Sequence, residues 1–337
     1  MRPTLHVFRD HHHAGLRGAS AVAIGNFDGV HLGHQALLRR ARELAAEVDP
    51  ADLAKVPGVA SEAVATAVVS FEPLPRAFFA PQAAPVRLTG PAEKLRLLRE
   101  NGVDLAWLLR FNAALAGLSA RAFVERILVR GLGARAVVIG EDFRFGRGRE
   151  GDLATMQALG DEYGFVVSPV GAVMADGLRI SSTAIREALA RGELDRAATL
   201  LGRPYALTGH VVRGRQLGRK LGYPTANLRP WGGAAPVDGV FAVRARVLDA
   251  DGAGGACGPW RDGVASVGVR PAVGGGEPLV EVHLFDFEGD LYGRRLETRF
   301  VKRLRGEEDF PDLDALVVQM NNDEREARAV LAHASAE

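Results

Sequence analysis

The stretch IGNFDGVHLGH, residues 24–34, decides how the first half of the chain folds. Before it, residues 19–24 are apolar and predict a buried strand, and after it apolar side chains recur at helical spacing over residues 35–48. The stretch is therefore a glycine-rich turn between a strand and a helix. Unpaired N–H groups and the dipole at a helix N-terminus attract phosphate, and His31 and His34 add side-chain donors. The sequence thus predicts a phosphate-binding turn.

The same alternation of strand and helix continues to about residue 188. Apolar, β-rich runs predict core strands, and runs with helical periodicity predict helices between them. This order predicts a doubly wound α/β domain with a parallel sheet. The further strands are expected at 64–71, 105–110, 135–140 and 165–170, the helices at 91–101, 119–130 and 153–160, and a loop at 49–62.

A second candidate phosphate motif is RISSTAIR, residues 179–186. Ser and Thr before an apolar periodic run mark a helix N-cap. One hydroxyl is enough for a cap, whereas three hydroxyls between two arginines suit a triphosphate. Asp28 in the first motif would either hold Mg²⁺ through water or orient the turn. The residues expected to bind ATP and its phosphates in this half are Gly25, Asn26, Phe27, Asp28, Gly29, Gly33, Arg179, Ser181, Ser182, Thr183 and Arg186.

The pattern changes after residue 188. A short helix at 193–201 ends at a Gly-Arg-Pro break, and short β runs with Gly/Pro turns come after it, with no helices between them. Such a pattern predicts an antiparallel barrel or sandwich, which an amphipathic helix at 312–332 closes. The expected β runs are 205–212, 239–248, 263–269, 279–285 and 296–301, and the expected division is a domain at 1–190, a linker with a short helix at 191–203, and a domain at 204–337.

The second domain carries its own candidate site in GRQLGRKLGYPTAN, residues 214–227. A glycine-rich arch with basic residues can wrap phosphates through backbone N–H groups, and Thr225 and Asn227 offer neutral oxygens that suit Mg²⁺. Glu281 lies on a predicted strand, where a lone glutamate is usually solvated. The arch residues expected to bind phosphate are Gly214, Gly218, Arg219 and Gly222.

These motifs carry a resemblance to a known family. GNFDGVHLGH resembles the nucleotidyltransferase signature of prokaryotic bifunctional riboflavin kinase/FMN adenylyltransferases, the FAD synthetases, and RISSTAIR, GRQLGRKLGYPTAN and VEVH (280–283) are similar to further motifs of that family. The resemblance implies a Rossmann-like nucleotidyltransferase domain followed by a β-barrel riboflavin kinase domain that ends in a helix. It also implies two activities that use ATP and Mg²⁺: phosphorylation of riboflavin to FMN, and adenylylation of FMN to FAD with release of pyrophosphate.

The resemblance also implies roles for particular residues. Glu281 is expected to be the catalytic carboxylate of the kinase, and His31 and His34 are expected to act in adenylyl transfer. The segment FEPLP, residues 71–75, is similar to one that lies beside the flavin in the family, although from the residues alone a rigid turn is an equally good interpretation. The residues expected to contact flavin are Phe71, Pro73, Asp142, Phe143 and Arg305.

Two positions depart from the family pattern. Ala272 stands where the family usually has threonine, and Asp309 stands where it usually has lysine. Neither position belongs to the expected metal or base residues.

The chemistry of the two steps fits the two sets of residues. Phosphorylating an alcohol needs a proton acceptor near neutral pH, and Glu281 is the candidate. Joining FMN to AMP needs no base, because the attacking phosphate is already ionised. That step needs positioning and charge neutralisation, which the histidines, hydroxyls and arginines of the first half can supply.

Composition narrows the class of protein. The net charge of +1 over 337 residues gives no electrostatic case for nucleic-acid or membrane binding. A single cysteine, Cys257, excludes an internal disulfide and suits a reducing cytoplasm. No apolar run approaches bilayer length, and the tract at residues 11–13, three histidines, is interpreted as a solvated loop. We expect a cytoplasmic enzyme acting on ATP, riboflavin and FMN.

Two alternatives remain open from the sequence. One is a nucleotidyltransferase with another acceptor, such as a pantetheine phosphate or nicotinamide mononucleotide, although such enzymes lack the β domain. The other is a flavin-binding protein whose kinase half has decayed. Thr225, Asn227 and Glu281 argue against decay, and Ala272 argues weakly for it.

Overall fold

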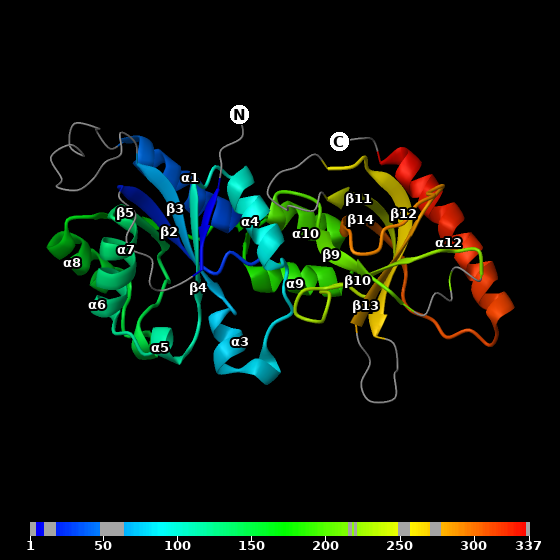
Figure 1. The fold of residues 1–337 in the computed structure, drawn as a ribbon, viewed down its shortest axis with the longest axis horizontal. Coiled ribbons are helices and arrows are strands. Elements are labelled where there is room, and N and C mark those ends of the chain that lie inside the picture. Colours follow the sequence, from blue (N-terminus) through cyan, green and yellow to red (C-terminus); the bar gives the residue numbers. More distant parts are fainter. Residues whose placement is uncertain are drawn as a thin grey trace. The chain divides into compact units, whose positions relative to one another are not determined.

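The structure is a computed structural model that describes residues 5–9, 18–47, 64–214, 218, 221–248, 257–269 and 278–334. The chain divides into two compact units, each with its own sheet (Figure 1). The first unit comprises Met1–Pro85 and Lys94–Ile180, and the second comprises Val86–Glu93 and Ser181–Glu337. The predictions made for the histidine tract, the loop at 49–62, Arg219 and Ala272 lie outside the described residues.

The first unit contains a six-stranded parallel sheet in the order β1-β4-β3-β2-β5-β6. The winding direction reverses at β2: β3 and β4 lie on one side of it, and β5 and β6 on the other. Ligands of open α/β sheets bind at the carboxyl edge beside such a reversal. The strands are β1 (His6–Phe8), β2 (Ser20–Ile24), β3 (Ala65–Glu72), β4 (Leu105–Arg110), β5 (Ala134–Gly140) and β6 (Val166–Val170).

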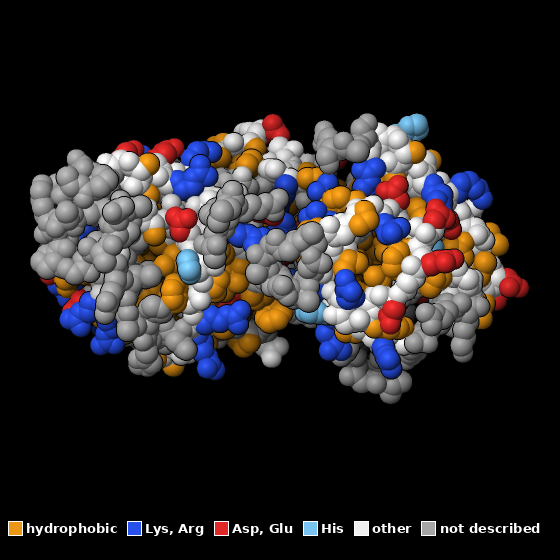
Figure 2. Space-filling view, turned by 45° about the horizontal axis from the view of Figure 1, so that its top comes forward, with side chains coloured by type: hydrophobic (Ala, Val, Ile, Leu, Met, Phe, Trp, Pro, Cys, Tyr) orange, Lys and Arg blue, Asp and Glu red, His pale blue; other side chains and the backbone are white. Residues whose placement is uncertain are grey.

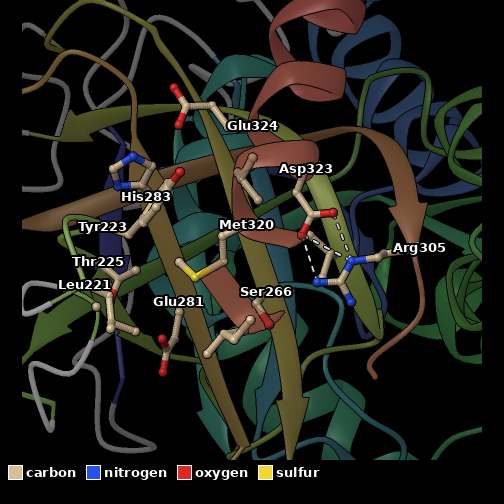
Figure 3. Close-up of a pocket in the computed structure, with 14 residues that line it drawn as sticks. Leu221, Tyr223, Thr225, Ser266, Glu281, His283, Arg305, Met320, Asp323 and Glu324 are labelled. Carbon is tan, nitrogen blue, oxygen red and sulfur yellow. Dashed lines mark hydrogen bonds and ion pairs between the residues drawn. The ribbon is translucent and has the colours of Figure 1, made fainter. Parts of the chain in front are cut away.

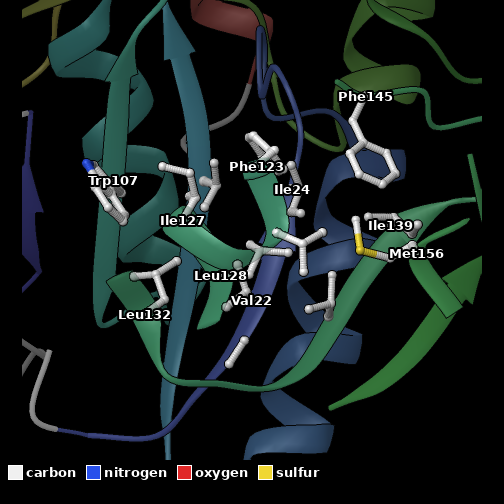
Figure 4. Close-up of a cluster of buried hydrophobic side chains, with 14 of the residues drawn as sticks. Val22, Ile24, Trp107, Phe123, Ile127, Leu128, Leu132, Ile139, Phe145 and Met156 are labelled. Carbon is white, nitrogen blue, oxygen red and sulfur yellow. The ribbon is translucent and has the colours of Figure 1, made fainter. Parts of the chain in front are cut away.

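Both faces of the four central strands of this sheet are buried, as expected for parallel strands. Along β2, Val22 and Ile24 pack into one apolar cluster with the helices after β4 and β5 (Figure 4), while Ala21 and Ala23 pack into the other with α1 and α4. The helices are α1 (Leu32–Glu47), α3 (Pro75–Phe79), α4 (Pro91–Glu100), α5 (Ala113–Ala116), α6 (Ala120–Phe123), α7 (Arg130–Leu132) and α8 (Leu153–Tyr163).

The five strands and three later helices expected from the sequence are confirmed to within a few residues. Ser119 accepts the N–H of Ala122, as predicted for a cap, but residues 124–129 of this helix have π geometry. Strand β1 was not predicted, because three residues are too few for periodicity to show. Helix α3 and the hairpin of β7 (Met174–Ala175) and β8 (Leu178–Arg179) were also not predicted.

The second unit is built on a closed antiparallel barrel in the order β10-β13-β12-β11-β14-β9. Closure pairs every strand on both sides and removes exposed sheet edges. The strands are β9 (Ala206–Val212), β10 (Ala226–Arg229), β11 (Gly239–Leu248), β12 (Arg261–Val269), β13 (Pro278–Leu284) and β14 (Arg295–Arg305). The expected barrel and its β runs are confirmed, and β10, which begins within the PTAN segment at Ala226, was missed.

Among the described residues of this unit, three helices accompany the barrel: α9 (Ser182–Ala190), α10 (Leu194–Leu201) and α12 (Leu313–His333). The C-terminal half of α12 packs on the barrel through Ala327 and Leu331, which join a cluster with Ala242 and Phe285. In its N-terminal half, Val318 is 60% exposed, so this half packs less tightly. By packing, α9 groups with the barrel, whereas the sequence-based division assigned residues up to 190 to the first domain.

In the described part of the chain, no helix combines the length and the apolar character needed to span a bilayer. On the face shown in Figure 2, basic and acidic side chains are both present on each unit, in keeping with the net charge of +1.

Candidate active sites of the two units

In the first unit, the turn after β2 presents two stacked imidazoles at the start of α1. His31 is the N-cap: its Nδ1 accepts the N–H of His34 at 3.3 Å, and the two rings stack at 3.7 Å. Because Nδ1 accepts a hydrogen bond, the proton of the His31 ring lies on Nε2. A Cβ at Gly33 would lie 3.1 Å from the His31 ring, so a larger residue at position 33 would displace the imidazole. The cap also explains why α1 begins three residues earlier than periodicity predicted.

The backbone of this turn is strained. Phe27, Gly29 and Val30 have φ of 47°, 86° and 41°, and left-handed backbone at a non-glycine residue costs about 1–3 kcal/mol. Phe27 and Val30 are fully buried and Asp28 is 1% exposed, so the surrounding core holds the turn in place. Strain held by packing is common at ligand sites.

The second phosphate motif starts in the first unit. Arg179 on β8 pairs with Asp142 in the loop after β5 (2.6 Å), so two residues predicted for different ligands lie side by side. Both side chains are more than half exposed.

The remainder of that motif belongs to the second unit. Ser181 caps α9, since its Oγ accepts the N–H of Ala184 at 3.2 Å. Ser182 and Thr183 form the first turn of α9, and Arg186 donates from Nε to the carbonyl of Val86 at 2.5 Å. One of the three hydroxyls therefore serves as the cap, and one of the two arginines contacts the backbone.

The aromatic residues predicted to contact flavin fall into two groups. Phe71, at the end of β3, packs edge-to-face on Phe111, which also contacts Phe78 and Phe79 of α3 at ring distances of 5.5 and 5.6 Å. Phe79 is 68% exposed, which is unusual for phenylalanine. Phe143, after β5, instead stacks on Phe145, and Pro73 precedes α3. The other three rings of the first group were not predicted, although the pair Phe78-Phe79, separated from FEPLP by two residues, was the available signal.

In the second unit, Glu281 lies on the outer face of β13. Its cross-strand partners are Asn227 on β10 and Ser266 on β12, and Thr225 precedes Asn227 on the same face. Val280 and Val282, which alternate with Glu281, point into the barrel core. Three residues predicted to act together, the carboxylate and the two neutral oxygen donors, are thus brought together by strand register.

A pocket of about 210 Å³ lies between this face and α12 (Figure 3). Met320 of α12 projects over it, toward Glu281 and Thr225. Its walls mix apolar and polar side chains, as small-molecule sites do. The lining residues are Gly218, Leu221, Tyr223, Thr225, Val240, Val264, Ser266, Glu281, His283, Arg305, Leu316, Met320, Asp323 and Glu324.

Arg305, predicted to contact flavin, lines the pocket but is held by Asp323. Its Nε and a terminal nitrogen lie 2.9 and 2.8 Å from the two carboxylate oxygens, and Gln319 donates to the same carboxylate at 2.8 Å. The hydrogen bond from Arg305 to Asp323 raises the pKa of Arg305 above its already high value. Glu324 likewise accepts from Arg328 at 2.8 Å. The two carboxylates that α12 contributes to the pocket are thus both paired with arginine.

The glycine-rich arch is shaped by close backbone packing. Tyr223 donates its N–H to the carbonyl of Gly218 at 2.7 Å, and Gly222 has φ of 85°. A Cβ at Gly214 would lie 2.5 Å from the Asn227 amide, so only glycine fits there. Burial and nearby Glu324 raise the pKa of Tyr223, whose hydroxyl donates to Asn321.

A second cavity of about 390 Å³, which the sequence analysis missed, opens at the mouth of the barrel. Phe287 and Tyr292 line it, and Arg261 and Arg213 lie over these two rings at 5.1 and 5.6 Å. Thr225 lines both this cavity and the pocket with Glu281. Among the described residues, no three His, Cys, Asp or Glu side chains converge as metal ligands.

The folds and sites define the class of protein: a transferase that joins a nucleotidyltransferase-like α/β unit to a β-barrel kinase unit. Residues 15–184 match the family model for FAD synthetase, and residues 201–331 match the model for riboflavin kinase. The chain belongs to the family of bifunctional riboflavin kinase/FMN adenylyltransferases. It has both activities, which confirms the family, fold class and function expected from the sequence.

Relatives match along almost the whole chain. The chain is 45% identical over 329 residues to the bifunctional riboflavin kinase/FMN adenylyltransferase of Pseudomonas fluorescens, covering 97% of this chain and 96% of that protein. It is 42% identical over 307 residues to the enzyme of the same name from Escherichia coli K12, covering 91% of each. A crystal structure described as a macrolide-efflux protein from Streptococcus pneumoniae superposes with a TM-score of 0.76 at 30% identity, covering 96% and 99% of the two chains.

Proposed function

We propose that riboflavin binds in the pocket between the barrel and α12, and that Glu281 accepts the proton of the hydroxyl that is phosphorylated. The observation that carries this proposal is the strand register that places Glu281 between Asn227 and Ser266, beside a pocket that Thr225, Ser266 and Glu281 line. The other two carboxylates of the pocket, Asp323 and Glu324, are engaged in ion pairs with Arg305 and Arg328.

The nucleotide of the kinase step is assigned to the barrel mouth. Phe287 and Tyr292 offer ring faces for a purine, and Thr225 connects this cavity to the Glu281 pocket. A phosphate chain that runs from the mouth past Thr225 therefore ends beside the riboflavin hydroxyl. Thr225 and Asn227 supply the hard oxygen donors that fit Mg²⁺, which, when bound, would neutralise the transferring phosphate.

Adenylyl transfer is assigned to the turn after β2. The Nε2 proton of His31 and the adjacent His34 ring suit neutralisation of phosphate charge, as does the N-terminus of α1. Asp28, with 1% exposure, orients the turn. The ring cluster of Phe71, Phe78, Phe79 and Phe111 is the proposed flavin contact in this unit, and Arg179 is assigned to ATP by the motif.

One assay tests the two activities on which both assignments rest. The protein is incubated with riboflavin, ATP and Mg²⁺, and the flavins are resolved by chromatography over time. FMN should appear first and FAD later; FAD should also form when FMN is supplied directly. If no FMN forms from riboflavin, the kinase site is not active.

We place the enzyme in the cytoplasm, where ATP is available and its single cysteine stays reduced.

The pairing of α12 with the barrel predicts an effect on riboflavin affinity. Asp323→Asn removes the charge that holds Arg305 at the pocket wall, and loss of a charge-assisted hydrogen bond costs about 1.5–3 kcal/mol. The KM for riboflavin should therefore rise about ten- to hundredfold, with FMN adenylylation unchanged. The control is Asp286→Asn, which breaks an exposed pair between the barrel and α12, a kind of pair that contributes little. A riboflavin KM within twofold of the parent in Asp323→Asn would show that the pair does not shape the pocket.

The domain division also predicts the behaviour of fragments. A fragment beginning at Gly202 contains every residue that lines the two barrel cavities, so it should phosphorylate riboflavin without forming FAD. It lacks α10, whose Leu194, Leu200 and Leu201 are buried. A fragment beginning at Ser181 keeps them and should unfold at a higher temperature. Thermal unfolding and flavin chromatography of both fragments make the test; two inert fragments from an active full chain would refute independence of the kinase unit.

A further inference from the structure

Lys94, on α4 of the first unit, is a buried cation that the assigned mechanism does not use. The sequence has 42 basic residues, of which four are lysine, and the lysine at 94 is 0% exposed. Taking an ammonium out of water is unfavourable unless it is paired or hydrogen-bonded. A buried lysine in a chain that otherwise uses arginine almost throughout therefore indicates a specific role.

The ammonium of Lys94 is bound to the turn that carries the histidines. Its Nζ donates to the carbonyl of Asn26 at 2.9 Å and to Ser70 Oγ at 3.3 Å, and Ser70 Oγ donates to the same carbonyl at 3.1 Å. One residue earlier, Gly25 donates its N–H to the carbonyl of Val69 at 3.1 Å and so extends the ladder between β2 and β3. The Asn26 carbonyl is thus the point at which the strand ends and the turn begins.

The strained part of the turn begins directly after Asn26. Phe27, Gly29 and Val30 all have left-handed backbone, and His31 is the next residue along the chain. Such a backbone persists only where its surroundings fix it. The Asn26 carbonyl accepts hydrogen bonds from Ser70 and from the charged Lys94, and these two bonds fix the start of the strained turn. The position of the two imidazoles is thereby fixed as well.

We propose that Lys94 is a positioning residue for adenylyl transfer. Its ammonium holds the Asn26 carbonyl and so preorganises the His31–His34 turn for the phosphates; this rests on the proposed assignment of that turn. Preorganised donors raise the rate because they need no rearrangement as charge develops. The compact ammonium suits this buried site, because the planar guanidinium of arginine is larger and presents its donors in a different geometry.

The test is Lys94→Met in the full chain, which keeps the length of the stem and removes the charge and the donors. The kcat for FAD formation from FMN and ATP should fall about ten- to hundredfold, the range expected for a lost charge-assisted hydrogen bond. The KM for FMN and the rate of riboflavin phosphorylation should stay within about twofold. Lys302→Met, the same change at an exposed lysine on β14, is the matched control and should leave both activities unchanged.

Ser70→Ala provides a second, independent variant, because it removes the neutral donor to the same carbonyl and leaves Lys94 in place. It should lower the same kcat a few-fold. The combined loss in the double variant should be smaller than the product of the single losses, since both act on one atom. A purely structural lysine would not produce this coupling in kcat. If Lys94→Met does not accumulate as folded protein, an unchanged kcat in Ser70→Ala overturns the proposal.

Assaying His31→Asn beside these variants distinguishes two kinds of failure. Either the role of Lys94 is wrong, or the assignment of adenylyl transfer to the His31 turn is wrong. An inactive His31→Asn with FAD formation by Lys94→Met within twofold of the parent overturns the role of Lys94 and leaves the site assignment standing. An active His31→Asn overturns the site assignment itself. A parallel loss of both activities and of thermal stability in Lys94→Met would also overturn the proposal, because it would make Lys94 a residue of the core only.

Discussion

Replacing Glu281 with glutamine is expected to lower the rate of riboflavin phosphorylation by about 10²–10⁴-fold, the usual contribution of a general base. Glutamine keeps the shape of the side chain and its hydrogen-bonding capacity beside Asn227 and Ser266, but it cannot take a proton at neutral pH. FMN supplied directly should still be converted to FAD at the normal rate, because that step belongs to the first unit. The measurement is a paired assay of the variant, once with riboflavin and once with FMN.

The control for this experiment is Glu326→Gln, the same change at a half-exposed glutamate of α12 outside the pocket. It should leave both activities within twofold. Loss of both activities in Glu281→Gln would indicate misfolding, and kinase activity within a few-fold of the parent would make Glu281 an ordinary strand residue.

The second large effect is expected at His31. Its ring has two separable functions, since Nδ1 caps α1 and Nε2 carries the proton available to phosphate. Removing one preorganised donor typically lowers kcat about 10²–10³-fold. Both His31→Ala and His31→Asn should therefore block FAD formation to this extent, and FMN should accumulate from riboflavin.

The two variants should differ in stability. Asparagine is a good N-cap, whereas alanine in place of a capping residue costs about 1 kcal/mol. Only His31→Ala should therefore lower the unfolding temperature of the first unit, as measured by thermal denaturation beside flavin chromatography. FAD output that stays at the parent level in His31→Asn would remove His31 from the mechanism.

The sequence by itself determined the order of the longer elements and the family. The strand before residue 25 and the helix after the turn are encoded by local periodicity, and capping residues such as Ser119 and Ser181 act on amides three positions away. Such signals lie within a few residues of one another, so they can be recognised from the sequence without knowledge of the tertiary structure. The same holds for the arch at 214–227, whose glycines reflect local backbone packing.

The sequence also indicated which residues are chemically suited to each step, but not how they are held. Arg305 was expected at the flavin, and the structure shows that Asp323, 18 residues further along the chain, binds its guanidinium. Phe71 and Phe143 were both expected at the flavin, and the structure places Phe71 with Phe111 and gives Phe143 a different partner. In each case the deciding contact comes from another part of the chain.

Only the tertiary structure decided which residues share a site. Strand register aligned Glu281 with Asn227, 54 positions apart, and packing buried Lys94 against Asn26, 68 positions apart. The barrel mouth exists because closure brings β9, β10 and β13 around Phe287 and Tyr292. The physical reason is that register and burial are set by the free energy of the whole core. The residues around a side chain in the sequence therefore do not show which neighbours it has across a sheet. They also do not show whether its charged group is buried.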